Sequence, residues 1–188
     1  IIKTNLTSPD TITLHKHLNF LKKKKIQNVI IESSSHGLCQ KRLHHINFKG
    51  AIFTNFSQDH LDYHKNMKSY LDAKLILFKE ILKKKSTIIS DKEIKQFSIL
   101  NKISKKKNLK LLNINKEFKI IKNKYLEKTS DFKIKNLAMA IKATKLCGLK
   151  NKQIYKSIKK IKDVNGRLEL VRKYPNGVKV FVDYAHTP

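Results

Sequence analysis

Three side chains that could hold a metal ion and a phosphate follow two apolar runs of this chain. Glu32 follows the run at 28–31, while Asn55 and His60 follow the run at 51–54. In an open α/β sheet, ligands bind at the carboxyl ends of the strands, so we expect these side chains to face one crevice. A carboxylate suits the hard cation Mg²⁺, whereas an imidazole is a less usual ligand for it. The pattern therefore predicts a metal and phosphate site with Glu32 and His60 as ligands.

Each of these residues also has an ordinary structural explanation. Glu32 could be a surface acid at the end of a strand, and His60 could be a packing or helix-capping residue. Asp59 and Asp62 could cap a helix, and His64 could lie at the surface. The Asp-His-x-Asp-x-His spacing would also suit a transition metal, although no cysteine joins it. These residues alone leave the alternatives open.

Lys74 lies in the middle of a predicted helix, between Ala73 and Leu75. A lysine in such a place usually extends its amine along the helix surface to water. Burial can instead lower the pKa of a lysine amine. A neutral amine reacts with carbon dioxide to give a carbamate, which is an anionic oxygen ligand for a cation. The residue types do not choose between these two roles.

The elements that would position these residues alternate between short apolar strands and amphipathic helices. This alternation predicts an α/β domain whose mostly parallel sheet is flanked by helices. Strands are expected at 28–32, 50–55, 86–90, 109–114, 118–122 and 178–184. Helices are expected at 11–25, 67–82, 136–146 and 152–161. Asp10 indicates a helix start, Gly148 a helix end, and Gly177 a turn.

The formal net charge of +28 would suit a nucleic-acid-binding protein, because a basic face releases counterions from phosphates. The lysines are spread along the chain, however, with runs at 22–25, 83–85 and 105–107 among isoleucine and asparagine. Arginine is scarce, and neither zinc-finger spacing nor an aromatic RNA-binding pattern is present. We interpret the many lysines as the result of a compositional bias, and we expect them on solvent-exposed faces. No specific nucleic-acid site is expected, only non-specific adhesion to polyanions at low salt.

Length and cysteine content limit the possible classes further. The 188 residues suffice for one domain, or for one domain and part of another. No run approaches the roughly 20 apolar residues of a membrane span, so no membrane partner is expected. Cys39 and Cys147 lie far apart without metal-ligand spacing, which favours a reducing compartment such as the cytoplasm. The chain begins with Ile1 rather than Met and stops just after a strand-like run, so we expect a piece of a longer protein.

Five sequence motifs occur in a characteristic order. They are ESSSHGLCQKR (32–42), TNFSQDHLDYH (54–64), YLDAKLILF (70–78), NGRLE (165–169) and DYAHTP (183–188). In this order they resemble the Mur ligase family, the ATP-dependent amide-forming enzymes of peptidoglycan synthesis. SSHG together with DYAHTP is most similar to the UDP-N-acetylmuramoyl-tripeptide synthetase (MurE) branch. The resemblance is strong over about 26–82 and 136–188 and thin over about 86–130.

The resemblance implies a domain organisation. Residues 1–164 would form the central ATP- and substrate-binding domain, a P-loop-type domain without its P-loop strand. The Gly-rich loop that cradles phosphates would lie upstream of Ile1. Residues 165–188 would form the hinge and the first strand of the C-terminal ligase domain. The chain on its own is therefore expected to be inactive.

The resemblance also assigns roles to individual residues. Glu32, His60 and Lys74 would be metal ligands, with Lys74 carbamylated to bind a second Mg²⁺, and His60 and Lys74 would be the catalytic residues. The substrate contacts would be Thr7, Ser8, Ser34, Gln40 and Arg42. The ATP contacts would be Asn55, Arg167, Asp183 and His186.

The implied reaction transfers the γ-phosphate of ATP to the D-glutamyl carboxylate of UDP-MurNAc-L-Ala-D-Glu. The amine of a diamino acid then displaces phosphate from the acyl phosphate, and Mg²⁺ stabilises the transferring group. A monomer is expected. One alternative is another Mur-type or polyglutamate-type ligase. Others are a non-catalytic remnant and a basic nucleic-acid-binding module, which would bind saturably in physiological salt.

Overall fold

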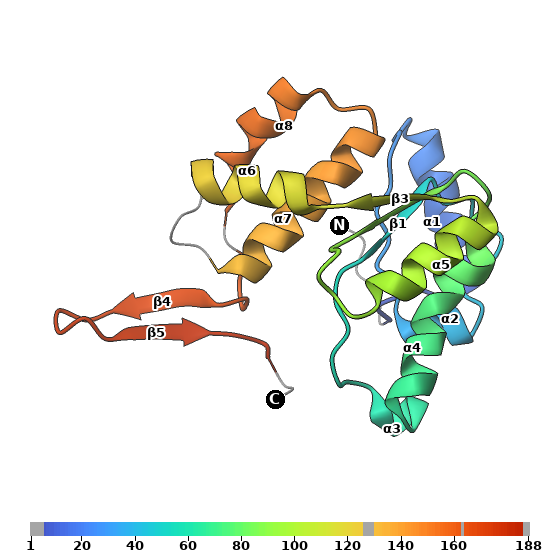
Figure 1. The fold of residues 1–188 in the computed structure, drawn as a ribbon, viewed down its shortest axis with the longest axis horizontal. Coiled ribbons are helices and arrows are strands. Elements are labelled where there is room, and N and C mark those ends of the chain that lie inside the picture. Colours follow the sequence, from blue (N-terminus) through green and yellow to red (C-terminus); the bar gives the residue numbers. More distant parts are fainter. Residues whose placement is uncertain (1–5, 126–129, 163, 186–188) are drawn as a thin grey trace. The chain divides into compact units, whose positions relative to one another are not determined.

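The computed structural model describes residues 6–125, 130–162 and 164–185, which belong to two compact units (Figure 1). The first unit extends to Gly148 and contains a parallel sheet with helices, and the second begins at Leu149. The predicted domain boundary after residue 164 stays a prediction. Within the described part of the chain, no helix has the length and apolar character that crossing a membrane requires.

A three-stranded parallel sheet lies in the first unit. Its strands are β1 (Gly50–Phe53), β2 (Thr87–Ser90) and β3 (Lys110–Asn113), in the order β1-β2-β3. β2 is buried along its whole length, as expected of a strand paired on both sides. The strands predicted at 50–55, 86–90 and 109–114 are thus confirmed, each slightly shorter than predicted.

Helices surround this sheet. They are α1 (Thr11–Lys23), α2 (Ser35–Cys39), α3 (Leu61–His64), α4 (Met67–Ile76), α5 (Phe97–Lys107), α6 (Asn115–Tyr125) and α7 (Asp131–Leu146). α4 continues into a π-helical turn, Leu77–Ile81, so the helix predicted at 67–82 is one helical segment. α5 packs on β2 and β3, and α7 packs on β1 and β2. The predicted fold, a parallel sheet flanked by helices, is confirmed.

Side chains that accept hydrogen bonds from the first turn mark the start of α1 and α4. Asp10 Oδ1 accepts a hydrogen bond from Thr13 N at 2.9 Å, and Asn66 Oδ1 accepts one from Ser69 N at 2.9 Å. These bonds satisfy backbone N–H groups that have no partner inside the helix. Gly148 lies just after the C-terminal end of α7 and has a φ of 92°, a conformation that glycine adopts without strain. The helix start at Asp10 and the helix end at Gly148 are therefore confirmed.

The apolar core fixes α2 and α4 beside β1. Leu38 of α2, Phe53 of β1 and Leu75 of α4 are all buried in the same cluster. Phe78 of the π-helical turn packs with Phe53, with ring centroids 5.9 Å apart. In Figure 1, α2 lies beside α4, and α3 lies at the end of α4. This packing brings the polar residues of the three helices into one neighbourhood.

Two predicted strands are wrong. Residues 28–32 form no strand, and Ile30 is 90% exposed. An apolar run becomes a strand only where another backbone pairs with it, and within the described residues β1 pairs with β2 alone. Residues 118–122 lie in α6 instead. Ile114, Glu117 and Ile121 are buried at helical spacing, which decides for a helix.

The second unit contains α8 (Asn151–Ile158) and an antiparallel hairpin of β4 (Glu169–Lys173) and β5 (Lys179–Val182). The predicted helix at 152–161 and the predicted strand at 178–184 are confirmed with shifted ends, whereas β4 is missing from the prediction. Tyr174 N donates to Val178 O at 2.8 Å across the predicted turn, in which Gly177 has a φ of 86°.

Candidate functional site

Ser8 joins the N-terminal segment to the loop that leads into α2. Its side chain is completely buried, at 0% exposure. Ser8 Oγ donates to Glu32 O at 2.9 Å and accepts from Ser34 N at 2.9 Å. Ser34 Oγ donates to Ser8 Oγ at 3.1 Å. These partners occupy the Ser8 hydroxyl, whereas Thr7 is exposed, and the substrate-binding roles of both residues stay predictions.

Gly37 permits this close contact. Ser34 caps α2, and its Oγ accepts a hydrogen bond from Gly37 N at 3.1 Å. A Cβ atom at position 37 would lie 2.7 Å from Ser8 Cβ and 3.1 Å from Ser34 Oγ. These separations are shorter than ordinary van der Waals contact. α2 can therefore approach Ser8 this closely only with glycine at this position.

Arg42 completes the same group of residues from the C-terminal side of α2. Arg42 Nη1 donates to Ser8 O at 2.9 Å, and Arg42 Nη2 donates to Gln40 Oε1. Four of the predicted substrate contacts are thus hydrogen-bonded to one another. We call them the serine–arginine group: Ser8, Ser34, Gln40 and Arg42. Gln40 Nε2 also donates to Tyr63 OH at 3.5 Å, which links this group to α3.

Histidine and tyrosine rings cluster next to the serine–arginine group. The ring centroid of His36 lies 5.2 Å from that of His60, 5.4 Å from that of His64 and 4.1 Å from that of Tyr63. The Tyr70 ring lies 5.7 Å from His60 and is stacked on His64 at 5.1 Å. We call these five residues the histidine cluster. Only His60 was a predicted site residue, although the spacing of 60, 63 and 64 suits one side of a short helix.

Lys74 lies one helical turn after Tyr70 on α4. Its Nζ is 4.8 Å from the centroid of the Tyr70 ring, which is a cation–π contact. His60 borders the same ring. The predicted ligands His60 and Lys74 therefore meet at Tyr70. The Lys74 amine forms no ion pair with a carboxylate of the described residues.

Asp59 holds His60 in place. Asp59 Oδ1 accepts a hydrogen bond from His60 N at 2.8 Å, and Asp59 Oδ2 lies 3.4 Å from His60 Nε2. His60 itself occupies the N-cap position of α3, with a φ of 53°. The capping roles considered for Asp59 and Asp62 are therefore wrong. A carboxylate beside an imidazole is a common partner of a histidine that binds a metal.

The remaining predicted ligand, Glu32, is exposed, and only its backbone carbonyl has a described partner. Among the described residues, no three His, Cys, Asp or Glu side chains lie close enough together to hold a metal ion. A metal site here would thus need an oxygen ligand from Lys74. A carbamate would supply it, and an anionic group suits a lysine that lies beside imidazoles without a carboxylate partner. The Mg²⁺-binding roles of Glu32, His60 and Lys74 stay predictions.

His64 is buried at 6% exposure, so the surface position considered for it is wrong. Burial lowers the pKa of His64, and the positive charges of His36, His60 and Lys74 lower it further, while Asp62 acts in the opposite direction. The neutral imidazole is therefore the favoured form near pH 7. His64 Nε2 lies 2.9 Å from Ser35 Oγ of α2.

The predicted ATP contacts lie in both units. Asn55 is exposed and follows the carboxyl end of β1. In the second unit, Asp183 is exposed after β5, and Arg167 Cζ lies 5.6 Å from the centroid of the Tyr184 ring. His186 lies outside the described residues. The nucleotide-binding roles of these residues stay predictions.

Sequence reasoning missed a set of buried charges near β2 and α7. Asp91 is buried directly after β2, with its Oδ2 2.6 Å from Lys135 Nζ, and this hydrogen bond raises the pKa of Lys135. Glu117 of α6 is buried between Lys142 and Lys145. Asp91 could have been found by the reasoning applied to Glu32, because it directly follows a short apolar run that was predicted to be a strand.

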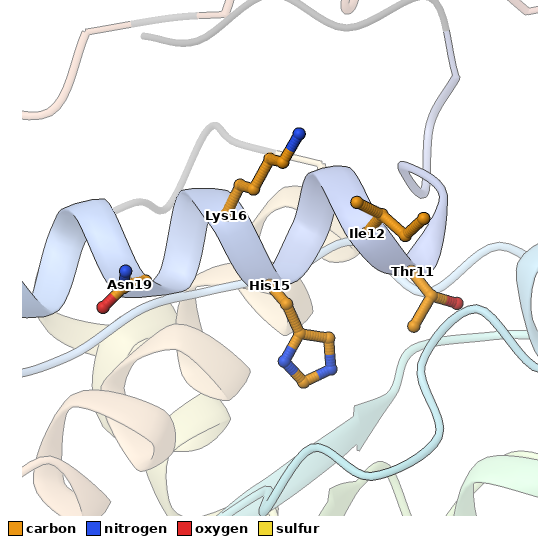
Figure 2. A pocket seen from close by; sticks show the side chains of 5 residues that line it. All are labelled: Thr11, Ile12, His15, Lys16 and Asn19. Carbon is orange, nitrogen blue, oxygen red and sulfur yellow. The ribbon is translucent and has the colours of Figure 1, made fainter.

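A surface pocket lies along α1, which begins three residues after Ser8. It is lined by Thr11, Ile12, His15, Lys16 and Asn19. Figure 2 shows that Lys16 and His15 point to opposite sides of the helix. None of the predicted site residues lines this pocket, so we do not assign it to the candidate site.

Comparison with known proteins identifies similar sequences. Residues 1–156 match the family model of the Mur ligase middle domain. The chain is 36% identical over 212 residues to UDP-N-acetylmuramoyl-L-alanyl-D-glutamate--2,6-diaminopimelate ligase of Wigglesworthia glossinidia brevipalpis, covering 99% of this chain and 42% of that protein. It is 35% identical over 205 residues to the ligase of the same name from Aquifex aeolicus, covering 100% of this chain and 42% of that protein. The chain thus spans less than half the length of these relatives.

Two solved structures share its fold. A structure of a ligase with the same name matches with a TM-score of 0.69 at 22% identity, covering 88% of this chain and 39% of that one. A crystal structure of MurF from Acinetobacter baumannii matches with a TM-score of 0.52 at 12% identity, covering 68% of this chain and 32% of that one. At these identities, the likeness concerns the fold alone.

Proposed function

The chain belongs to the Mur ligase family, and from this we propose that the protein containing it is an ATP-dependent ligase of peptidoglycan synthesis. Its proposed substrates are UDP-MurNAc-L-Ala-D-Glu and a diamino acid. Because the names of its relatives specify 2,6-diaminopimelate, we propose that this is the diamino acid used. We further propose a monomeric enzyme that works in the cytoplasm.

The observation that carries the proposal is the direct connection between the serine–arginine group and the histidine cluster. Gln40, which follows α2, reaches Tyr63, and Ser35 of α2 reaches His64, so two contacts join the α2 region to α3. The residues proposed to bind the dipeptide thereby lie next to those proposed to bind the metal. A reaction between a carboxylate and a phosphate requires that arrangement. Arg42 adds a guanidinium that could form charge-assisted hydrogen bonds to a carboxylate or phosphate.

Glu32, His60 and Lys74, the last as a carbamate, are the residues proposed to hold Mg²⁺. A cation bound there would neutralise charge on the transferring phosphoryl group. Asp59 would keep the His60 imidazole oriented through its Oδ2, which lies 3.4 Å from His60 Nε2 in the structure. We propose that the nucleotide is contacted by Asn55, Arg167, Asp183 and His186.

The proposed chemistry has two steps. An oxygen of the D-glutamyl carboxylate attacks the γ-phosphorus of ATP, the bond to the bridging oxygen breaks, and ADP leaves. The amine of diaminopimelate then attacks the acyl carbon of the acyl phosphate. The amide bond forms as phosphate leaves and the amine loses a proton. Alignment of the two reactants is the main contribution that the serine–arginine group can make.

The test uses the full-length protein encoded by the gene that contains this chain. With ATP, Mg²⁺ and UDP-MurNAc-L-Ala-D-Glu, it should release phosphate only when diaminopimelate is added, and mass spectrometry should detect the UDP-linked tripeptide. Lysine in place of diaminopimelate tests the choice of diamino acid. Phosphate release that does not depend on the dipeptide, or no tripeptide product, would contradict the proposal.

A substitution of Lys74 tests the metal site within the same assay. Lys74→Ala should lower turnover about 100-fold, because a group that stabilises transition-state charge would be lost. Lys68→Ala, which changes an exposed lysine of the same helix, is the matched control and should leave turnover unchanged. Equal activity of the two variants would exclude Lys74 from the site.

A further inference from the structure

His64 contacts both parts of the candidate site and is not one of the residues expected to bind a ligand. Its Nε2 lies 2.9 Å from Ser35 Oγ, and its ring stacks on Tyr70 with centroids 5.1 Å apart and an angle of 26° between the planes. All three side chains are buried. His64 belongs to α3, Ser35 to α2 and Tyr70 to α4. One side chain thus joins three helices.

The contact with Ser35 acts on the N-terminus of α2. Ser35 is the first residue of α2 and follows Ser34, which caps the helix and contacts Ser8. Ser35 Oγ and His64 Nε2 are hydrogen-bonded to each other inside the protein. Removing either would leave a buried polar atom without its partner, which is unfavourable. The position of the serine–arginine group therefore depends on this hydrogen bond.

The contact with Tyr70 acts on Lys74. The Tyr70 ring packs against His64 and also against Phe56, at a centroid distance of 5.1 Å. The Lys74 amine lies over the same ring at 4.8 Å. Tyr70 and Lys74 are one helical turn apart, so their side chains are neighbours on α4. Loss of the imidazole would leave the Tyr70 ring free to shift. The Lys74 amine would then lose the fixed position of the ring that it contacts.

We propose that His64 is a positioning residue of the ligase site. Its Nε2 fixes the dipeptide-binding end of α2 through Ser35, and its ring fixes Lys74 through Tyr70. This inference rests on the proposed function, because it assigns the effect of His64 to dipeptide binding and to turnover. The two contacts use different parts of one imidazole, so they can be removed separately.

Three variants separate the two contacts. His64→Phe keeps an aromatic ring on Tyr70 and removes the partner of Ser35. Ser35→Ala removes the same hydrogen bond from the other side. His64→Gln keeps a polar group near the position of Nε2 and removes the stacked ring. His15→Gln changes an exposed histidine of α1 and serves as the control.

Steady-state kinetics of the full-length protein should divide these variants into two classes. His64→Phe and Ser35→Ala should raise KM for UDP-MurNAc-L-Ala-D-Glu about tenfold and leave kcat nearly unchanged. His64→Gln should lower kcat about tenfold and leave that KM nearly unchanged. His15→Gln should match the unmodified protein. The melting temperature of each variant establishes that folded proteins are compared.

Binding measured by calorimetry gives a readout that does not need turnover. His64→Phe should weaken binding of the dipeptide substrate about tenfold, whereas His64→Gln should not. Proportional loss in all three variants, or a lower melting temperature with unchanged kinetics and binding, would overturn the proposal. If the unmodified protein binds the dipeptide but forms no product, the proposed function fails. The calorimetric comparison then still decides the role of His64.

Discussion

Glu117 is a single buried residue on which the packing of α6 and α7 depends. Its Oε2 lies 3.0 Å from Lys142 Nζ, and its Oε1 lies 3.2 Å from Lys145 Nζ. Burial alone raises the pKa of Glu117, but hydrogen bonds from the two lysines outweigh that effect and hold the pKa below its usual value. The ionised carboxylate therefore holds the two helices together in the folded state.

Glu117→Gln should lower the free energy of unfolding by about 3 kcal/mol, because two partly buried lysines would lose their charge partner. Urea unfolding of the chain measures this change. Glu93→Gln is the control: that side chain is 61% exposed and pairs with Lys135 at the surface. Its loss should change the unfolding free energy by less than about 1 kcal/mol. Equal losses of unfolding free energy in the two variants would mean that burial does not strengthen the ion pairs of Glu117.

The lowered pKa also makes stability depend on pH. Because Glu117 has a lower pKa folded than unfolded, its contribution is fully present above the unfolded value of about 4.3. That contribution is lost as the pH falls through the folded value. Unfolding measured between neutral and acidic pH should therefore show a component that Glu117→Gln lacks. Identical pH profiles would contradict this account.

At the scale of elements, the approach of α2 to the N-terminal segment should be sensitive to one added carbon. Gly37→Ala should destabilise the chain by about 1–3 kcal/mol, because its Cβ would clash with Ser8. Ser8→Gly removes the atoms nearest that Cβ. The double variant should therefore be no less stable than Ser8→Gly alone, as measured by a double-mutant cycle in urea. Additive losses would contradict a direct clash.

Several elements could be predicted because local signals agree with the packing. α1 has a capping aspartate and a helical apolar stripe, and β2 is a short apolar run that becomes buried. The run at 28–32 has the same apolar character, but a strand also requires a partner backbone, which the sequence does not reveal. The run at 118–122 is short and rich in apolar residues like a strand, and only the wider spacing with Ile114 identifies the helix.

The same limit applies to the candidate site. Motif order led to Ser34, His60 and Lys74, and the structure places His60 and Lys74 at one tyrosine ring. The burial of Ser8 and His64 was not predictable, because it depends on how α2 and α4 pack together. Whether the Glu32 carboxylate joins the other two ligands stays a prediction.

At the scale of the whole molecule, exposed lysines gather around the amino ends of the parallel strands. The segments that lead into β1, β2 and β3, together with the first residue of β3, carry exposed lysines, which we call the amino-end lysine face: Lys49, Lys83, Lys84, Lys85, Lys105, Lys106 and Lys110. Lys85 N donates to Asn108 O at 2.8 Å, which brings two lysine runs together. Residues 82–90 and 97–114 contain no aspartate or glutamate.

This face should dominate non-specific binding to polyanions. We compare a face variant, Lys83, Lys84, Lys85, Lys105 and Lys106 to Gln, with a control, Lys16, Lys22, Lys23, Lys24 and Lys25 to Gln. Both sets are exposed, and each contains one lysine with positive φ, Lys85 at 69° and Lys25 at 56°. Binding of a single-stranded oligonucleotide is measured at several salt concentrations, which gives the slope of log K against log salt concentration. Compared with the unmodified chain, the steepness of this slope should fall by about 2–3 for the face variant and by less for the control.

Two results would contradict this interpretation of the charge. Equal effects of both sets would mean that the lysines act only through total charge. Saturable binding in physiological salt, tighter than the roughly 10⁻⁶ M limit of non-specific association, would support a nucleic-acid-binding function instead.

The missing strand at 28–32 has a consequence for the behaviour of the chain in solution. Within the described residues, β1 pairs only with β2, so its other edge has no strand partner there. Ile52 of β1 is exposed, as are Val29 and Ile30 of the run at 28–32. An unpaired strand edge is a template on which another copy can add a strand. The net charge of +28 opposes that step by mutual repulsion between copies. Salt screens the repulsion within about 10 Å at 0.1 M, so the colloidal stability of the isolated chain should be highest in dilute buffer.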